Sequence, residues 1–73
     1  MTNKQAYQAL NEVNAHWGRK DDNHIYVWTD GYKTADHYSV EKYLMQAGMR
    51  MVSEEFDSHC GKTQAIYKHK KGA

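Results

Sequence analysis

The sequence predicts an α+β fold, a two-layer sandwich in which two helices cover one face of a small mixed sheet. Two segments show the periodicity of amphipathic helices, and three others have the alternation or the β-branched and aromatic composition of strands. The predicted order is α-β-α-β-β. A right-handed β-α-β crossover would make the first two strands parallel, and the last hairpin would add an antiparallel strand. With 73 residues, the chain is expected to form one small domain spanning residues 1–73.

The first predicted helix begins after Thr2, which has the capping-box spacing to Gln5. Apolar residues then recur at helical intervals and lie on one predicted face: Ala6, Leu10, Val13 and Trp17. Gly18 is expected to end this helix, because glycine tolerates the backbone conformation of a helix terminus.

The first predicted strand covers residues 24–29, which are rich in β-branched and aromatic side chains. Its alternation predicts two faces, one with Ile25 and Val27 and the other with Tyr26 and Trp28. Because both helices should cover the same side of the sheet, the second face is expected to meet either solvent or a partner.

A turn at Asp30-Gly31 follows this strand. Residues 32–36 have two possible roles. They either pair back as a short edge strand, which would extend the predicted three-stranded sheet to four strands, or they lead into the next helix. We favour the lead-in. The second helix has Ser39 as its expected N-cap and Gly48 as its C-terminal glycine. Its apolar face is formed by Val40, Tyr43, Leu44 and Ala47.

A final hairpin is predicted from residues 49–56 and 62–70, with 57–61 as its loop. In its first strand, Met49 and Met51 are expected to oppose Val52 and Phe56. Ile, Leu, Val and Phe together number only 9, whereas the chain has 6 Tyr, 2 Trp and 4 Met. We therefore expect an interior rich in aromatic and sulfur-containing side chains.

Charge is unevenly distributed, although the formal net charge is only +1. Residues 1–20 carry a net charge of +2, residues 21–57 carry −5, and residues 58–73 carry +4. A dipolar surface of this kind can orient an encounter with a charged partner. No apolar run approaches the length of a membrane span, and the single Cys60 cannot form an internal disulfide. We expect a cytoplasmic protein without membrane contact.

The motifs of enzymes and metal proteins are missing from the sequence. None of the paired histidine and cysteine spacings of zinc sites occurs, and no glycine-rich phosphate loop is present. A metal site assembled in space from His37, His59 and Cys60 is a hypothesis that we do not favour. We expect no catalytic residues, no metal and no cofactor.

Contact with a protein partner is the predicted activity, because tyrosine and tryptophan are suited to interface anchors and a domain this small has little room for a deep pocket. The candidate partner-binding residues are Tyr26, Trp28, Tyr32, Tyr38, Glu54, Glu55, Phe56 and Asp57. The acidic members could engage a basic groove on the partner, including one in a nucleic-acid-processing complex. The competing interpretation is that most of these aromatic residues belong to the core. A homodimer is also compatible with so small a core.

The alternative function is binding of single-stranded nucleic acid, with bases stacked on sheet aromatics and lysines at the phosphates. The candidates for this role are Tyr67, Lys68, Lys70 and Lys71. Against it stands the acidic segment from Asp21 to Asp57, which would repel a phosphate backbone.

In its size, its missing catalytic motifs and its dense polar composition, the chain resembles the small accessory proteins of bacteriophages and mobile elements. That group includes host-takeover factors and anti-CRISPR proteins. The resemblance is one of general character, and it transfers no residue role to this chain. It implies an inhibitor that occupies a surface or a nucleic-acid groove of its partner.

Overall fold

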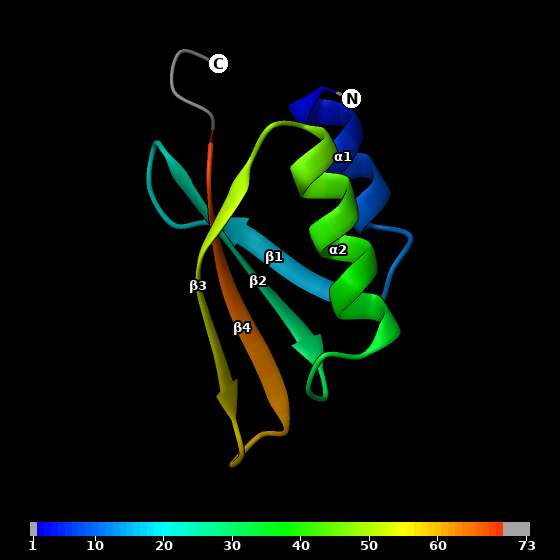
Figure 1. The fold of residues 1–73 in the computed structure, drawn as a ribbon, viewed down its shortest axis with the longest axis vertical. Coiled ribbons are helices and arrows are strands. Elements are labelled where there is room, and N and C mark those ends of the chain that lie inside the picture. The colour runs from blue at the N-terminus through cyan, green and yellow to red at the C-terminus, as the bar shows by residue number, and fades with distance from the viewer. Residues whose placement is uncertain (1, 70–73) are drawn as a thin grey trace.

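Two helices lie on one face of a four-stranded antiparallel sheet in the computed structural model, which describes residues 2–69 (Figure 1). The elements are α1 (Asn3–Leu10), β1 (Ala15–Arg19), β2 (His24–Asp30), α2 (Ala35–Gln46), β3 (Arg50–Asp57) and β4 (Lys62–Lys68). The strand order is β1-β2-β4-β3, so that β1 and β3 form the two edges. The predicted α+β class, with two helices on one face of the sheet, is confirmed, but the sheet has four strands rather than three.

The predicted mixed sheet is wrong, because every pair of neighbouring strands is antiparallel, although the first two predicted strands do run in the same direction as expected. The strands before and after α2, β2 and β3, run in the same direction, but β4 lies between them and pairs antiparallel with both. In this register Ala65 of β4 is opposite Val27 of β2 and Glu54 of β3. After β3 a short loop leads into β4, which lies between β2 and β3. Every strand therefore has an antiparallel neighbour.

The first helix ends at Leu10, earlier than predicted, and the chain then forms β1. Trp17 does lie on the helix side of the sheet, because it is opposite Val27 in the β1–β2 pair. Gly18 is therefore a strand residue and not a helix terminus. A Cβ atom at Gly18 would lie 2.5 Å from the hydroxyl oxygen of Tyr26, so glycine makes room for that side chain on the opposite face.

The ends of the helices follow two different patterns. The capping box of α1 is confirmed, because Thr2 Oγ1 accepts a hydrogen bond from the Gln5 N–H at 3.1 Å and Gln5 Oε1 accepts one from the Thr2 N–H at 2.9 Å. Helix α2 begins at Ala35, before the predicted N-cap Ser39, and its N-cap is Thr34. Residues 32–34 form the turn that leads into α2, so they add no strand.

Aliphatic residues form most of the core, between the helices and the sheet. The buried hydrophobic residues are Ala6, Leu10, Ile25, Val27, Val40, Leu44, Met49, Ala65 and Tyr67. Only one of them is aromatic and one contains sulfur, so the expected aromatic and sulfur-rich interior is wrong. The scarce aliphatic side chains fill the small core, and most aromatic rings remain outside it. Neither described helix is long and apolar enough to cross a membrane.

Candidate functional site

The candidate partner-binding residues lie mainly around the free edge of β3, which pairs only with β4 among the described residues. We call this region the β3 rim. Its helix-side group comprises Tyr32, Tyr38, Glu54 and Phe56, and its open-side group comprises Trp28, Glu55 and Asp57. None of the predicted partner-binding residues is fully buried, so the competing interpretation of most of them as core residues is wrong.

The helix-side group presents three exposed aromatic side chains. Tyr32 and Phe56 meet edge to face, with ring centroids 5.5 Å apart, and the exposed fractions of these residues are 57% and 41%. Tyr38, on the first turns of α2, is 55% exposed. Lys33 Nζ lies 5.4 Å from the centroid of the Tyr32 ring, and the pKa of Lys33 is raised, mainly by Tyr32 and less by Glu54. The lysine therefore keeps its charge beside the aromatic pair.

A buried polar cluster lies beside this group, between helix α2 and the sheet. His37 is only 3% exposed, and its Nε2 atom lies 3.6 Å from Glu54 Oε1 and 3.8 Å from Glu41 Oε2. The fully buried Tyr67 lies close to the same two carboxylates. Burial, and then Glu41 and Glu54, raise the pKa of the Tyr67 hydroxyl well above its usual range. His37 thus links helix α2 to Glu54 of β3.

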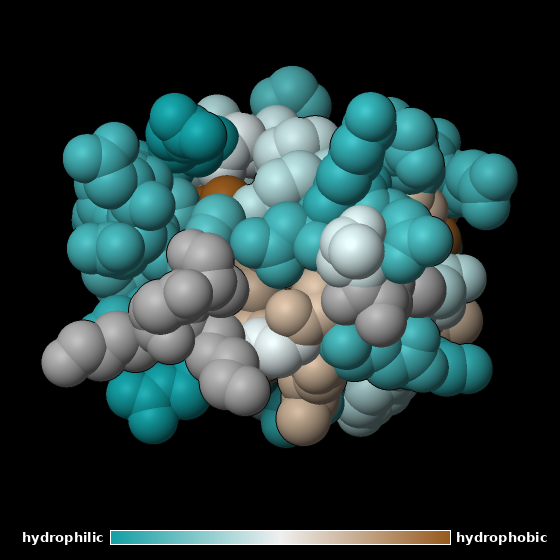
Figure 2. Space-filling view, turned by 90° about the horizontal axis from the view of Figure 1, so that it is seen from above, coloured by the Kyte–Doolittle hydropathy of each residue, from teal (hydrophilic) through white to brown (hydrophobic). Residues whose placement is uncertain are grey.

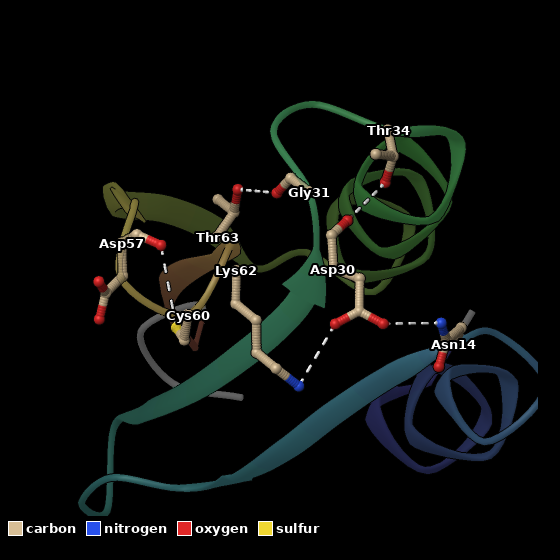
Figure 3. A network of polar contacts seen from close by, with 8 residues as sticks. All are labelled: Asn14, Asp30, Gly31, Thr34, Asp57, Cys60, Lys62 and Thr63. Carbon is tan, nitrogen blue, oxygen red and sulfur yellow. Dashed lines mark hydrogen bonds and ion pairs between the residues drawn. The ribbon is translucent and has the colours of Figure 1, made fainter.

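The turn that carries Tyr32 is held by a network of polar contacts (Figure 3). Thr63 Oγ1 donates a hydrogen bond to the Gly31 carbonyl, and Thr34 Oγ1 donates one to the Asp30 carbonyl at 3.2 Å. The Asp30 carboxylate accepts a hydrogen bond from Asn14 Nδ2 at 3.1 Å and pairs with Lys62 Nζ at 3.3 Å. Strands β2 and β4 and the loop before β1 are therefore tied together at the base of this turn.

The open-side group borders a pocket of about 380 Å³ on the face of the sheet away from the helices. Its lining residues are Trp28, Glu55, Phe56, Asp57, Ser58, His59 and Gln64. Gln64 lies opposite Trp28 on one side and Glu55 on the other, so the three side chains form a row across β2, β4 and β3. The Asp57 carboxylate accepts a hydrogen bond from the His59 N–H at 2.9 Å, which closes the loop at one wall of the pocket.

Basic residues gather at the other end of the open face. His24, Lys68 and Arg50 are cross-strand neighbours there, on β2, β4 and β3. Tyr26 lies one row nearer the centre of this face, so it is separate from the β3 rim. Asp21 accepts hydrogen bonds from His24 Nδ1 and from the Asn23 N–H, both at 2.8 Å, and these bonds lower its pKa.

The nucleic-acid candidates are not brought together as predicted. Tyr67 is fully buried on the helix side, so its ring cannot stack with a base. The alternation of β4 places Tyr67 on the side of Ala65 and Thr63, which face the core. Lys68 does reach the open face, whereas Lys70 and Lys71 lie outside the described residues.

Sequence reasoning missed Gln64, Ser58 and His59 in the pocket and Arg50 in the basic row. The pairing register that aligns Gln64 with Trp28 and Glu55 is a long-range property with no local signal. The metal hypothesis gains no support, because within residues 2–69 no three His, Cys, Asp or Glu side chains are placed to hold an ion.

The end of the fold where α1 begins and β4 ends is mostly hydrophilic where its described residues are visible (Figure 2). Tyr32 and Phe56 lie near the opposite end of the sheet, because Tyr32 follows the end of β2 and Phe56 is the partner of Thr63 near the start of β4. In comparisons with known proteins, the chain matches no family model, no curated protein and no solved structure.

Proposed function

We propose that the chain is a non-enzymatic protein-binding module whose β3 rim docks on a partner protein. The observation that carries this proposal is the exposed aromatic group of Tyr32, Phe56 and Tyr38 beside Glu54. Complete burial of a large apolar side chain contributes roughly 1.5–3 kcal/mol of free energy. Because these rings are about half exposed, about half of that free energy is still to be gained when a partner covers them. Clustered aromatic side chains are the usual anchors of protein interfaces.

The backbone of the turn also supports docking at this position. Gly31 and Lys33 both have positive φ angles, of 79° and 52°. A residue other than glycine rarely adopts this conformation, and such residues concentrate at functional sites. In this turn Lys33, next to the exposed Tyr32, is the residue that adopts the unfavourable conformation.

The charge of the rim indicates the kind of partner. Glu54 lies on the helix side of β3 and Glu55 and Asp57 lie on the open side, and the charge of Glu54 contributes to the raised pKa of Lys33. An acidic rim is attracted to a basic surface, which raises the association rate and fixes the orientation of the complex. A basic groove that normally receives nucleic acid has this chemistry. By occupying such a groove, the module would inhibit a nucleic-acid-processing complex, and we assign it to the cytoplasm, where a single unpaired cysteine is ordinary.

The test is affinity capture from a lysate of the source cells with nuclease present, using the tagged chain and two variants. The variant Phe56→Ser removes an anchor of the rim. Met45→Ser is the matched control, because Met45 is 57% exposed but lies near the far end of α2. The proposal expects a stoichiometric protein that Phe56→Ser loses and Met45→Ser keeps. Equal capture by all three chains would contradict it.

A second candidate function is binding of single-stranded nucleic acid on the open face. The observation that favours it is the row of His24, Lys68 and Arg50 next to Tyr26, which would place phosphate-binding groups beside an aromatic ring. Fluorescence anisotropy with a labelled oligothymidylate would test it. Binding that weakens at least tenfold in Lys68→Gln but not in Lys4→Gln would support this candidate, and an oligonucleotide that does not bind at low salt would remove it.

A further inference from the structure

The open-side pocket has walls of two different kinds. An indole ring stands on β2 at Trp28, and two carboxylates stand on β3 at Glu55 and Asp57. The amide side chain of Gln64 lies between them on β4. Adjacent strands are about 4.8 Å apart, so the backbones at Trp28 and Glu55 are separated by about 10 Å. A side chain that enters over Gln64 can therefore touch the ring and the carboxylates at the same time.

This combination of groups selects a cation. The face of an indole ring attracts a positive charge, and a carboxylate accepts charge-assisted hydrogen bonds from it. A planar guanidinium group satisfies both partners at once, because it stacks on aromatic rings and presents a fork of N–H donors to carboxylates. Gln64 adds a neutral acceptor for a further N–H. A phosphate or carboxylate ligand would instead face Glu55 and Asp57 directly.

No cation of the described chain already fills this role. Lys62 is the cross-strand neighbour of Asp57, but its Nζ lies 3.3 Å from Asp30. Glu55 makes no ion pair within residues 2–69. His59 contacts Asp57 through its backbone N–H. The pocket volume of about 380 Å³ lies at the lower end of the range for ligand sites, about 300–1,000 Å³.

We propose that the pocket between Trp28 and Glu55 receives an arginine side chain of the partner protein. The assignment rests on the proposed function, because the arginine belongs to the partner that docks on the β3 rim. Phe56 belongs to both sides of this rim, since its ring meets Tyr32 and it also lines the pocket. A partner that covers the aromatic group can thus insert an arginine around the edge of β3.

The isolated chain can test this without the partner. N-acetyl-arginine methylamide is titrated into ¹⁵N-labelled protein, and the indole N–H of Trp28 and the side-chain amide of Gln64 are followed by NMR. We expect both signals to shift in a saturable way, while N-acetyl-glutamine methylamide, which has no charge, leaves them in place. Trp28→Phe assigns the indole signal and separates it from that of Trp17.

The matched variants are Glu55→Gln and Glu12→Gln, which each remove one negative charge, the second on an exposed residue beyond the end of α1. We expect Glu55→Gln to weaken arginine binding about threefold, the effect of one exposed ion pair worth about 0.7 kcal/mol, and Glu12→Gln to leave it unchanged. Equal shifts with the arginine and glutamine probes, or no shifts with either, would overturn the assignment. A third probe, the anion thymidine monophosphate, is titrated separately, and shifts that appear only with this anion would overturn it as well.

The two proposals can fail separately. If the arginine probe does not bind but Phe56→Ser still abolishes capture of a partner, the rim functions without an arginine pocket. If the probe binds as expected but no partner is captured, the pocket is an arginine site and the docking role of the aromatic group is wrong.

Discussion

Replacing Tyr67 by phenylalanine should stabilise the protein. Tyr67 is completely buried, and its hydroxyl has no hydrogen-bond partner among residues 2–69. A buried hydroxyl without a partner costs about 1–3 kcal/mol, because it loses its hydrogen bonds to water on folding. Phenylalanine removes this cost and keeps the ring that packs in the core, at the expense of a small void. We therefore expect Tyr67→Phe to raise the free energy of unfolding by about 1 kcal/mol.

The same substitution changes the dependence of stability on pH. Burial and the nearby Glu41 and Glu54 raise the pKa of Tyr67 in the folded state. The stability from keeping this group neutral is complete below the unfolded pKa of about 10 and is lost as the pH rises towards the folded pKa. In that range the wild type loses up to about 1.4 kcal/mol per pH unit through this group alone. Tyr67→Phe lacks this loss, so its advantage should grow above pH 10.

Thermal and urea unfolding, followed by circular dichroism at neutral pH and at pH 10.5, measure both effects. For a domain of this size, 1 kcal/mol corresponds to a rise in Tm of about 4–8 °C. A Tm that falls by several degrees in Tyr67→Phe would refute the reasoning, because it would mean that the hydroxyl is hydrogen-bonded in the folded protein. An advantage that does not change with pH would refute the assignment of the raised pKa.

Three further predictions follow from local contacts. Gly18→Ala should displace the Tyr26 ring, because the new methyl group would lie 2.5 Å from its hydroxyl oxygen. Since the end of a side chain can move, we expect a loss of stability below about 1 kcal/mol together with a shift of the Tyr26 ring signals in NMR spectra. Unchanged ring signals would contradict this. Thr2→Ala removes the side-chain cap of α1 and should cost about 1 kcal/mol in urea unfolding, whereas no loss would mean that the cap is replaced by water. Asp21 should titrate below its usual pKa because it accepts a hydrogen bond from His24, and the stability from this contact is present above about pH 4 and lost as the pH falls further; a titration of the Asp21 carboxyl carbon at the ordinary pKa would disprove it.

Local patterns predicted the elements whose signals are strong. The capping box at Thr2 begins α1 as expected, and the alternation of β2 separates Val27 from Trp28 on the predicted faces. The predicted length of the first helix was wrong, because the spacing of apolar residues from Leu10 to Trp17 fits a helix and also fits a turn followed by a strand. Over so few residues, helical and strand periodicity place the same apolar side chains towards the core.

The sheet order and part of the site could not be predicted locally. The insertion of β4 between β2 and β3 depends on pairing between distant segments. In β3, Met51 and Phe56 were expected on opposite faces, but a bulge between Met51 and Ser53 shifts the alternation and places both on the helix side. The bulge brings Phe56 to Tyr32, and no pattern in the sequence indicates it.

The helix-side aromatic group is tested most directly by site-specific photocrosslinking in the source cells. A benzoylphenylalanine is placed at Tyr32, at Phe56 or, as the control, at Met45, and the cells are irradiated. Docking through the β3 rim predicts one crosslinked protein that is common to positions 32 and 56 and missing from position 45. Crosslinks of equal yield from all three positions, or from position 45 alone, would contradict it.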